Sequence, residues 1–175
     1  MNRKIRSGAK RAVLGAAAAV ALGAGALASS PAGADSSTGK YYTIEHTEFS
    51  TRVFTAASSS PGSAVSLSPY TGSDRQHWLW EPADGLGMHL VNKRTGLCLH
   101  AEPSRQVTSK TCANVSAQSW LWGHYSLAGG GTELRLRHVA SDRVISVSID
   151  QVGLQLPTSY ANPNQKLKST FRGQD

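Results

Sequence analysis

The chain has 175 residues, 39% of them hydrophobic and 17% charged, so it can bury one modest core and has no room for two ordinary domains. Its net charge of +7 would suggest a nucleic-acid or membrane-surface partner if it were spread over the whole chain. Residues 1–34 hold five of the 18 Lys and Arg and none of the 11 Asp and Glu, which leaves 13 basic and 11 acidic residues, a net +2. The remainder is therefore close to neutral, and its charge does not indicate a nucleic-acid partner.

The first 34 residues have the pattern of a secretory signal peptide. A basic start precedes an uncharged run from Ala12 to Ala28, and Ala32-Gly33-Ala34 forms a small-x-small cleavage site before Asp35. The alternative is a transmembrane anchor, but 17 residues rich in Gly and Ala are short for a membrane span, and no second apolar run follows. We expect cleavage, secretion to the extracellular space and no membrane attachment afterwards. The Ala-rich leader resembles those of high-GC Gram-positive bacteria.

The rest of the chain is predicted to be all-β. Residues 35–40 are polar and predicted to be disordered, and residues 41–175 are predicted to form a single domain. Short runs of β-forming residues at 41–44, 87–91 and 144–147 lie between turns rich in Gly, Pro, Ser and Asn. The stretches 58–62 and 129–131 are too short to link domains, so we expect them to be exposed turns.

Two cysteines, Cys98 and Cys112, are predicted to form a disulfide because an even number of cysteines in an exported protein favours pairing. The alternative is two buried free thiols. No His or second Cys lies at metal-ligand spacing beside either cysteine, so we predict no metal site.

Internal repeats organise the domain. Gln76-His77-Trp78 and Gln118-Ser119-Trp120 lie 42 residues apart, each followed by Leu-Trp, and a decayed third copy, Gln165-Lys166-Leu167, follows 47 residues later. A short predicted strand lies 20 to 22 residues before each Gln. The third residues of these strands are predicted to be equivalent: Phe54, Cys98 and Ile145.

Each repeat of about 42 residues has room for four strands, which predicts twelve short strands in three pseudo-symmetric repeats, at about 41–84, 85–128 and 129–175. One such unit cannot bury its apolar side alone, so the three units are expected to close around one axis.

These features resemble the ricin B-chain type β-trefoil lectins. The resemblance rests on the Gln-x-Trp copies and on residues 95–99, Thr-Gly-Leu-Cys-Leu, with a second Cys fourteen residues after the first, and it covers the chain after the leader. It implies a β-trefoil in which the indoles fill the barrel core and the Gln amides hold the backbone of their own repeats. The residues given these structural roles are Gln76, Trp78, Gln118, Trp120 and Gln165, with Leu167 as the third core residue.

In the resembled family, a working repeat binds sugar through an Asp after the first Cys, an aromatic ring near the second Cys and an Asn before the Gln. Carboxylate and amide groups hydrogen-bond paired hydroxyls, and the ring covers the apolar face of the sugar. Here the expected Asp positions hold Ala56, His100 and Val147. The expected Asn positions hold Arg75, Ala117 and Asn164, so only the third repeat retains the Asn.

A sugar site is therefore predicted in the third repeat. Tyr160 and Asn164 share one loop, and Gln155 lies on the preceding strand. Asp150 would supply the missing carboxylate if residues 149–153 fold back toward Asn164. Asp150 and Asn164 would then bind paired hydroxyls, and Tyr160 would cover the ring face.

A second candidate lies in the middle repeat, where His100 could replace the Asp with Glu102 supplying a carboxylate. The alternative for His100 is a solvated strand end. Trp80 and Trp122 are expected to lie in the core or at the barrel end, whereas Tyr70 and Tyr125 are possible sugar platforms.

No catalytic motif is present, so the sequence does not predict an enzyme or a cofactor. Two functions remain. The first is a secreted carbohydrate-binding module with degenerate, weak sites for a glycan or polysaccharide. The alternative is a trefoil without sugar binding that contacts a secreted protein, as an accessory subunit or an inhibitor of an extracellular enzyme.

Overall fold

The computed structural model describes residues 39–48, 51–83, 85, 87–130, 132–148, 151–157 and 162–174. All of them belong to one compact unit, Ala34–Asp175. The predicted signal peptide and residues 35–38 of the segment predicted to be disordered lie outside the described residues. The prediction of disorder is wrong at Lys40, which begins β1 and pairs with Gln174. None of the described helices is long and apolar enough to cross a membrane.

The described chain contains twelve β-strands, three short 3-10 helices and no α-helix, which confirms the all-β prediction. The strands are β1 Lys40–His46, β2 Arg52–Ala56, β3 Ser63–Pro69, β4 Trp78–Pro82, β5 Met88–Asn92, β6 Leu97–Ala101, β7 Val107–Thr111, β8 Trp120–Ser126, β9 Thr132–His138, β10 Arg143–Ser148, β11 Gln151–Gln155 and β12 Leu167–Gln174. The 3-10 helices are η1 Asp74–Gln76, η2 Ser116–Gln118 and η3 Pro163–Gln165.

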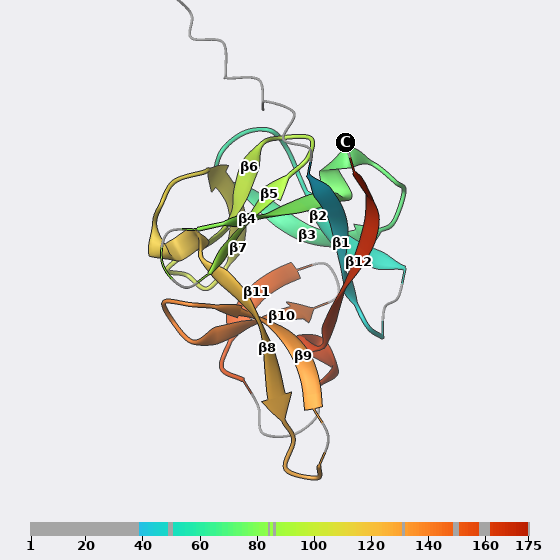
Figure 1. The fold of residues 1–175 in the computed structure, drawn as a ribbon, viewed down its shortest axis with the longest axis vertical. Helices are drawn as coiled ribbons and strands as arrows, with labels where there is room; N and C mark the ends of the chain where they lie inside the picture. The colour runs from blue at the N-terminus through green and yellow to red at the C-terminus, as the bar shows by residue number, and fades with distance from the viewer. Residues whose placement is uncertain are drawn as a thin grey trace, which may run out of the picture. The chain divides into compact units, whose positions relative to one another are not determined.

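The strands form one antiparallel network that closes on itself (Figure 1). Pairing runs from β5 through β4, β1, β2, β3, β7 and β6, and the pairing of β5 with β6 completes a ring of seven strands. Strands β8, β9, β10 and β11 continue from β5, and β12 pairs with β1. This closure leaves few unpaired strand edges.

Side chains alternate between the two faces of a strand. In each of three hairpins, the residues of one face are buried and form the core. In β2–β3, Phe54 pairs with Leu67 and Ala56 pairs with Val65, and all four side chains are buried in the core. The equivalent core residues of the other two hairpins are Leu99, Ala101 and Val107, and Ile145, Val147, Val152 and Leu154.

Two indoles lie at the centre of this core. Trp78 and Trp120 are fully buried, and each donates its indole N–H to a backbone carbonyl, of Phe54 at 3.1 Å and of Leu99 at 3.0 Å. Leu167 is buried at the corresponding place after η3.

The three Gln residues of the repeats end the 3-10 helices and are buried. Gln76 donates to the Pro69 carbonyl at 2.7 Å, Gln118 to the Thr111 carbonyl at 2.9 Å, and Gln165 to the Leu156 carbonyl at 2.9 Å. Each amide therefore joins its 3-10 helix to the end of the preceding hairpin, where it satisfies a backbone carbonyl.

The equivalence predicted for Cys98 is wrong by one residue. Trp120 bonds to Leu99 as Trp78 bonds to Phe54, so Leu99 is the counterpart of Phe54 and Ile145 in the core. Cys98 points to the opposite face, where it forms the disulfide with Cys112. Ala56 and Val147, which were predicted at the Asp positions of the first and third repeats, also belong to the core. Each lies two residues after a core residue, Phe54 or Ile145, and therefore on the same face of its strand.

The disulfide between Cys98 and Cys112 is present and joins chain segments 14 residues apart. On the chain-entropy model, a loop of this length stabilises the fold by about 3 kcal/mol. The double variant Cys98→Ala/Cys112→Ala is expected to lose about this much free energy of unfolding in a urea titration. Two alkylatable thiols in unreduced native protein would contradict the assignment.

Candidate functional site

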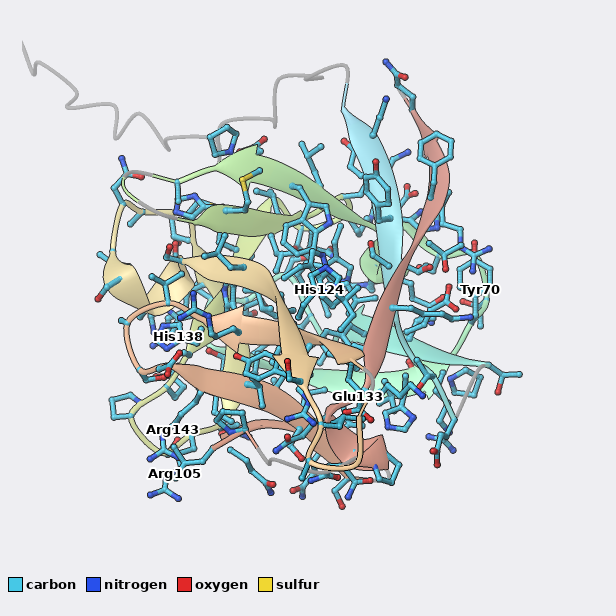
Figure 2. All side chains as sticks on the ribbon, turned by 60° about the horizontal axis from the view of Figure 1, so that its bottom comes forward. Tyr70, Arg105, His124, Glu133, His138 and Arg143 are labelled. Carbon is cyan, nitrogen blue, oxygen red and sulfur yellow. A yellow bond between two sulfur atoms is a disulfide. The ribbon has the colours of Figure 1, made fainter. Side chains whose placement is uncertain are left out.

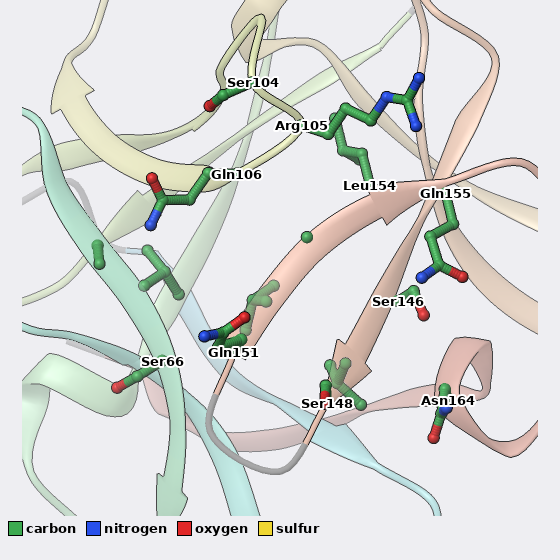
Figure 3. Close-up of a pocket in the computed structure, with 15 residues that line it drawn as sticks. Ser66, Ser104, Arg105, Gln106, Ser146, Ser148, Gln151, Leu154, Gln155 and Asn164 are labelled. Atoms are coloured by element: carbon green, nitrogen blue, oxygen red, sulfur yellow. The ribbon is translucent and has the colours of Figure 1, made fainter.

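A polar cavity of about 620 Å³ lies beside the β10–β11 hairpin (Figure 3). Its lining comes from β10 and β11, from η3, from the turn between β6 and β7, and from β3. The lining side chains with polar groups are Ser66, Ser104, Arg105, Gln106, Ser146, Ser148, Gln151, Gln155 and Asn164. Its volume lies within the range of small-molecule sites in proteins.

Strand alternation creates this polar face. Ile145 and Val147 point into the core, so Ser146 and Ser148 point the other way, and their cross-strand partners on β11 are Gly153 and Gln151. One face of β10–β11 therefore packs in the core, and the other face, which lines the cavity, carries hydrogen-bonding groups.

Two of the predicted sugar-binding residues, Gln155 and Asn164, line this one cavity. Asn164 is brought there by η3, whose N-cap Asn162 accepts a hydrogen bond from the Asn164 backbone N–H. Asp150 and Tyr160 lie outside the described residues.

The hairpins β2–β3, β6–β7 and β10–β11, each followed by a 3-10 helix, can be compared through their strand registers. Three corresponding side chains in β10–β11 and η3 are Ser146, Gln155 and Asn164. None of these three side chains hydrogen-bonds to another residue in the described part of the chain. A hydroxyl and two amides provide donors and acceptors at a cavity wall, which is the chemistry that recognises paired hydroxyl groups. Unpaired polar groups of this kind gain most from a polar ligand.

The equivalent side chains of the first repeat bond within their own repeat. The Thr55 and Ser68 hydroxyls hydrogen-bond to each other, and Gln76 also donates to Thr55. Arg75, which replaces the Asn, directs its guanidinium to the Ala56 carbonyl and to Ser59, each at 3.5 Å. This repeat offers no comparable set of free groups.

In the middle repeat, the equivalent positions hold His100, Lys110 and Ala117, and the first two lie beside the Glu102 carboxylate. Lys110 lies 2.7 Å from the Glu102 carboxylate and 3.5 Å from His100 Nε2. The Glu102 carboxylate also accepts from Thr108 at 2.8 Å and lies 3.8 Å from His100. The predicted proximity of His100 and Glu102 is therefore observed, although Lys110 binds the carboxylate more closely.

His100 and Lys110 also line a second cavity, of about 340 Å³, together with Val115 and Gln118. Burial, followed by the positive charge of Lys110, lowers the pKa of His100. Its Nδ1 has no hydrogen-bond partner among the described residues. A neutral imidazole is thus favoured at neutral pH.

Three histidines and two glutamates make stability depend on pH. The hydrogen bond from Lys110 lowers the pKa of Glu102. Burial lowers the pKa of His46, His100 and His138 below the usual 6.5. Burial raises the pKa of Glu45, but hydrogen bonds from Thr43, Lys168, Thr170 and Arg172 outweigh it and lower that pKa to about 2.

As the pH falls, these histidines bind protons in the unfolded chain at a higher pH than in the folded protein. Protonation therefore favours the unfolded chain, and the free energy of unfolding is expected to fall as the pH drops below 6.5. Glu45 stabilises the fold above its unfolded pKa of 4.5, and this contribution is lost as the pH falls toward 2. Urea unfolding followed by Trp fluorescence between pH 8 and pH 3 tests both steps. Glu45→Gln should reduce the acidic step and leave the histidine step unchanged, and a midpoint unchanged down to pH 4 would contradict the histidine effect.

Four aromatic residues considered from the sequence, Trp80, Trp122, Tyr70 and Tyr125, each contact another ring or a cation. Trp80 and Trp122 are half-buried, pack against the core and lie 5.6 Å apart by ring centroids, which agrees with a place at the barrel end. Tyr70 is exposed, but Arg172 lies 4.4 Å over its ring. Tyr125 is half-buried, with the Arg135 guanidinium 5.1 Å over its ring.

Several lining residues were not predicted. Ser146 was missed because the predicted equivalence pointed to Val147 instead, and hydrophobic alternation along β10 is the signal that locates it. Ser66, Arg105 and Gln106 come from other repeats, and no local pattern marks them.

No protein-family model matches the sequence, and no curated protein matches it. Solved structures do resemble the fold. The designed threefold-symmetric protein ThreeFoil has a TM-score of 0.59 at 22% identity, over 74% of this chain and 97% of that chain. The Vibrio vulnificus hemolysin/cytolysin β-trefoil lectin, solved with N-acetyl-D-lactosamine bound, has a TM-score of 0.62 at 16% identity, over 78% and 98%. The chain has the β-trefoil fold.

A further trefoil of this kind is the C-half of the earthworm R-type lectin in complex with GalNAc, with a TM-score of 0.56 at 15% identity, over 76% of this chain and 99% of that chain. These identities are low, so the comparisons establish the trefoil fold and not a particular ligand. Among the described residues, this trefoil has no group of three or more His, Cys, Asp or Glu side chains that could hold a metal ion.

Proposed function

We propose that this β-trefoil is a secreted carbohydrate-binding module whose sugar site is the cavity beside β10–β11. The observation that carries the proposal is the contrast between repeats. Ser146, Gln155 and Asn164 are unpaired within the described chain, whereas the equivalent side chains of the first repeat, and His100 and Lys110 of the middle repeat, lie against groups of their own repeats. Binding of sugars by two structurally similar trefoils, one with N-acetyl-D-lactosamine and one with GalNAc, supports it at the level of the fold.

In this proposal Asn164 and Gln155 hydrogen-bond neighbouring sugar hydroxyls, and Ser146 contributes a third polar contact. Asp150 and Tyr160 are proposed to complete the site from the adjoining loops, as carboxylate and as ring platform. Because the Asp and aromatic positions of the ricin-type pattern are replaced, we expect weak binding, with Kd in the millimolar to high micromolar range, about −4 to −6 kcal/mol.

The proposal also includes three ricin-type repeats and export through the signal peptide at residues 1–34. The three Gln residues that end η1, η2 and η3 and the buried Trp78, Trp120 and Leu167 support the repeat arrangement. The disulfide supports an oxidising compartment.

Calorimetric titration of the protein without residues 1–34 with galactose, N-acetylgalactosamine, glucose and lactose tests the site. Asn164→Ala is expected to weaken binding at least tenfold, because it removes two hydrogen-bonding groups from the cavity wall. His100→Ala is the matched control in the middle repeat and is expected to change binding less than twofold.

Loss of binding in His100→Ala, with Asn164→Ala unaffected, would place the site in the middle repeat. No binding to any of these sugars, or to a broad glycan array, would overturn the carbohydrate proposal and favour contact with a secreted protein.

A further inference from the structure

The turn between β6 and β7 belongs to the second repeat but is fixed against the third. The Arg105 carbonyl accepts the Leu154 backbone N–H at 2.8 Å, and Gln106 forms a β-bridge with Gly153. Within the turn, the Arg105 N–H bonds to the Glu102 carbonyl at 2.9 Å. These bonds place Arg105 at the wall of the cavity that Gln155 and Asn164 also line.

Arg105 has a backbone conformation that is unusual for a residue other than glycine. Its φ is +69°, in the left-handed region that glycine adopts readily and arginine rarely does. Across from it, a Cβ on Gly153 would lie 3.3 Å from the Arg105 carbonyl oxygen, so the close approach favours glycine at that position. A strained residue held by its surroundings and lining a cavity is a candidate functional residue.

The charge of Arg105 is unpaired within the described chain. Its guanidinium makes no ion pair or side-chain hydrogen bond with a described residue. Arg137 and Arg172 do pair, at 2.8 Å from Asp142 and at 2.6 Å from Glu45. Arg94 and Arg143 also have no such partner among the described residues, but neither lines the cavity. The described lining of the cavity contains this one cation and no carboxylate, and Asp150, the carboxylate proposed above for the site, lies outside the described residues.

The arginine is also well placed to reach a ligand. Its side chain is exposed, and in Figure 3 it leaves the turn toward the end of β11 that carries Gln155. Figure 2 shows Arg105 at the edge of the ribbon, directed away from the core. A planar guanidinium presents two parallel N–H donors, which match the oxygens of a carboxylate or a sulfate.

We propose that Arg105 is a specificity-determining residue of the β10–β11 cavity and that the glycan bound there carries an anionic group, a carboxylate or a sulfate. This inference rests on the proposed carbohydrate-binding function. The amides of Gln155 and Asn164 bind hydroxyls, and Arg105 binds the anionic substituent from across the cavity. A charge-assisted hydrogen bond at an exposed site should favour an acidic ligand by about tenfold over its neutral counterpart.

Two matched pairs of probes test the proposal by titration in 50 mM NaCl. Digalacturonic acid is compared with galactobiose, and galactose 6-sulfate with galactose, so that the two pairs separate carboxylate from sulfate recognition. At least one acidic probe is expected to bind about tenfold more tightly than its neutral partner, and the difference should shrink below threefold in 500 mM NaCl because salt screens exposed charges.

Arg105→Gln is expected to abolish the preference while changing the affinity for the neutral probes less than twofold. Arg105→Gly removes the charge but accepts the left-handed backbone, so it separates loss of charge from disturbance of the turn. Arg94→Gln removes one positive charge in the turn between β5 and β6, outside the cavity lining, and should retain the preference.

Equal affinity of the protein for acidic and neutral probes, or a preference that survives Arg105→Gln and Arg105→Gly, would overturn the assignment of Arg105. In either case, binding of neutral probes that depends on Asn164 would leave the proposed function standing. Failure of every acidic and neutral probe to bind would overturn both.

Discussion

Trp120→Ala is expected to lower the free energy of unfolding by about 3 to 5 kcal/mol, the cost of leaving a large cavity in a packed core. The Trp120 side chain is fully buried, and its indole N–H donates to the Leu99 carbonyl at 3.0 Å. Its ring also lies 5.2 Å from that of His138, between centroids. Urea unfolding followed by circular dichroism measures the loss.

Two controls separate core packing from ligand contact. Trp120→Phe keeps a ring in the core and should cost less than Trp120→Ala, and Trp122→Ala removes an indole that is only half-buried. If Trp120→Ala unfolded at the wild-type urea concentration yet lost sugar binding, the indole would be a binding residue, and its place in the core would be wrong.

Arg135→Met is expected to cost about 3 to 5 kcal/mol, because it leaves the Glu133 carboxylate buried without its cationic partner. Arg135 is fully buried on β9, and its guanidinium donates twice to the same Glu133 oxygen, at 3.2 and 2.7 Å. The Glu133 side chain is only 4% exposed, so water cannot replace the lost arginine.

The double variant Glu133→Gln/Arg135→Met is the informative control, because it removes both charges. It is expected to recover most of the stability lost in Arg135→Met. A loss of less than about 1 kcal/mol in Arg135→Met would show that the buried Glu133 carboxylate does not depend on Arg135.

The sequence was sufficient to predict the fold because a few bulky and polar residues recur at fixed spacing. Gln76 and Gln118 each precede an indole by two residues, and both pairs are buried as that pattern indicates. The even number of cysteines in a chain predicted to be exported likewise predicted the disulfide between Cys98 and Cys112, which is present. The alignment of the repeats failed at Cys98, because a buried half-cystine resembles a small core residue in sequence while facing the opposite side of its strand.

The candidate site was only partly predictable. Asn164 and Gln155 belong to one repeat and follow its local pattern, so they could be chosen from sequence. Arg105 is held at the same cavity by a backbone hydrogen bond with Leu154, nearly fifty residues later in the chain. The local spacing of residues does not predict such a contact. Long-range pairing between repeats determines this part of the site.

The internal pairing in the first two repeats has a consequence for how the protein would act on a surface. With Thr55 bonded to Ser68 and Lys110 to Glu102, one repeat of three keeps free polar groups at these positions. A lectin with several sites cross-links cells and precipitates branched polysaccharides, and it gains avidity from simultaneous contacts. A trefoil with one site instead attaches one molecule to one glycan, so the sugar site proposed beside β10–β11 predicts that this protein coats a glycan surface without agglutinating it.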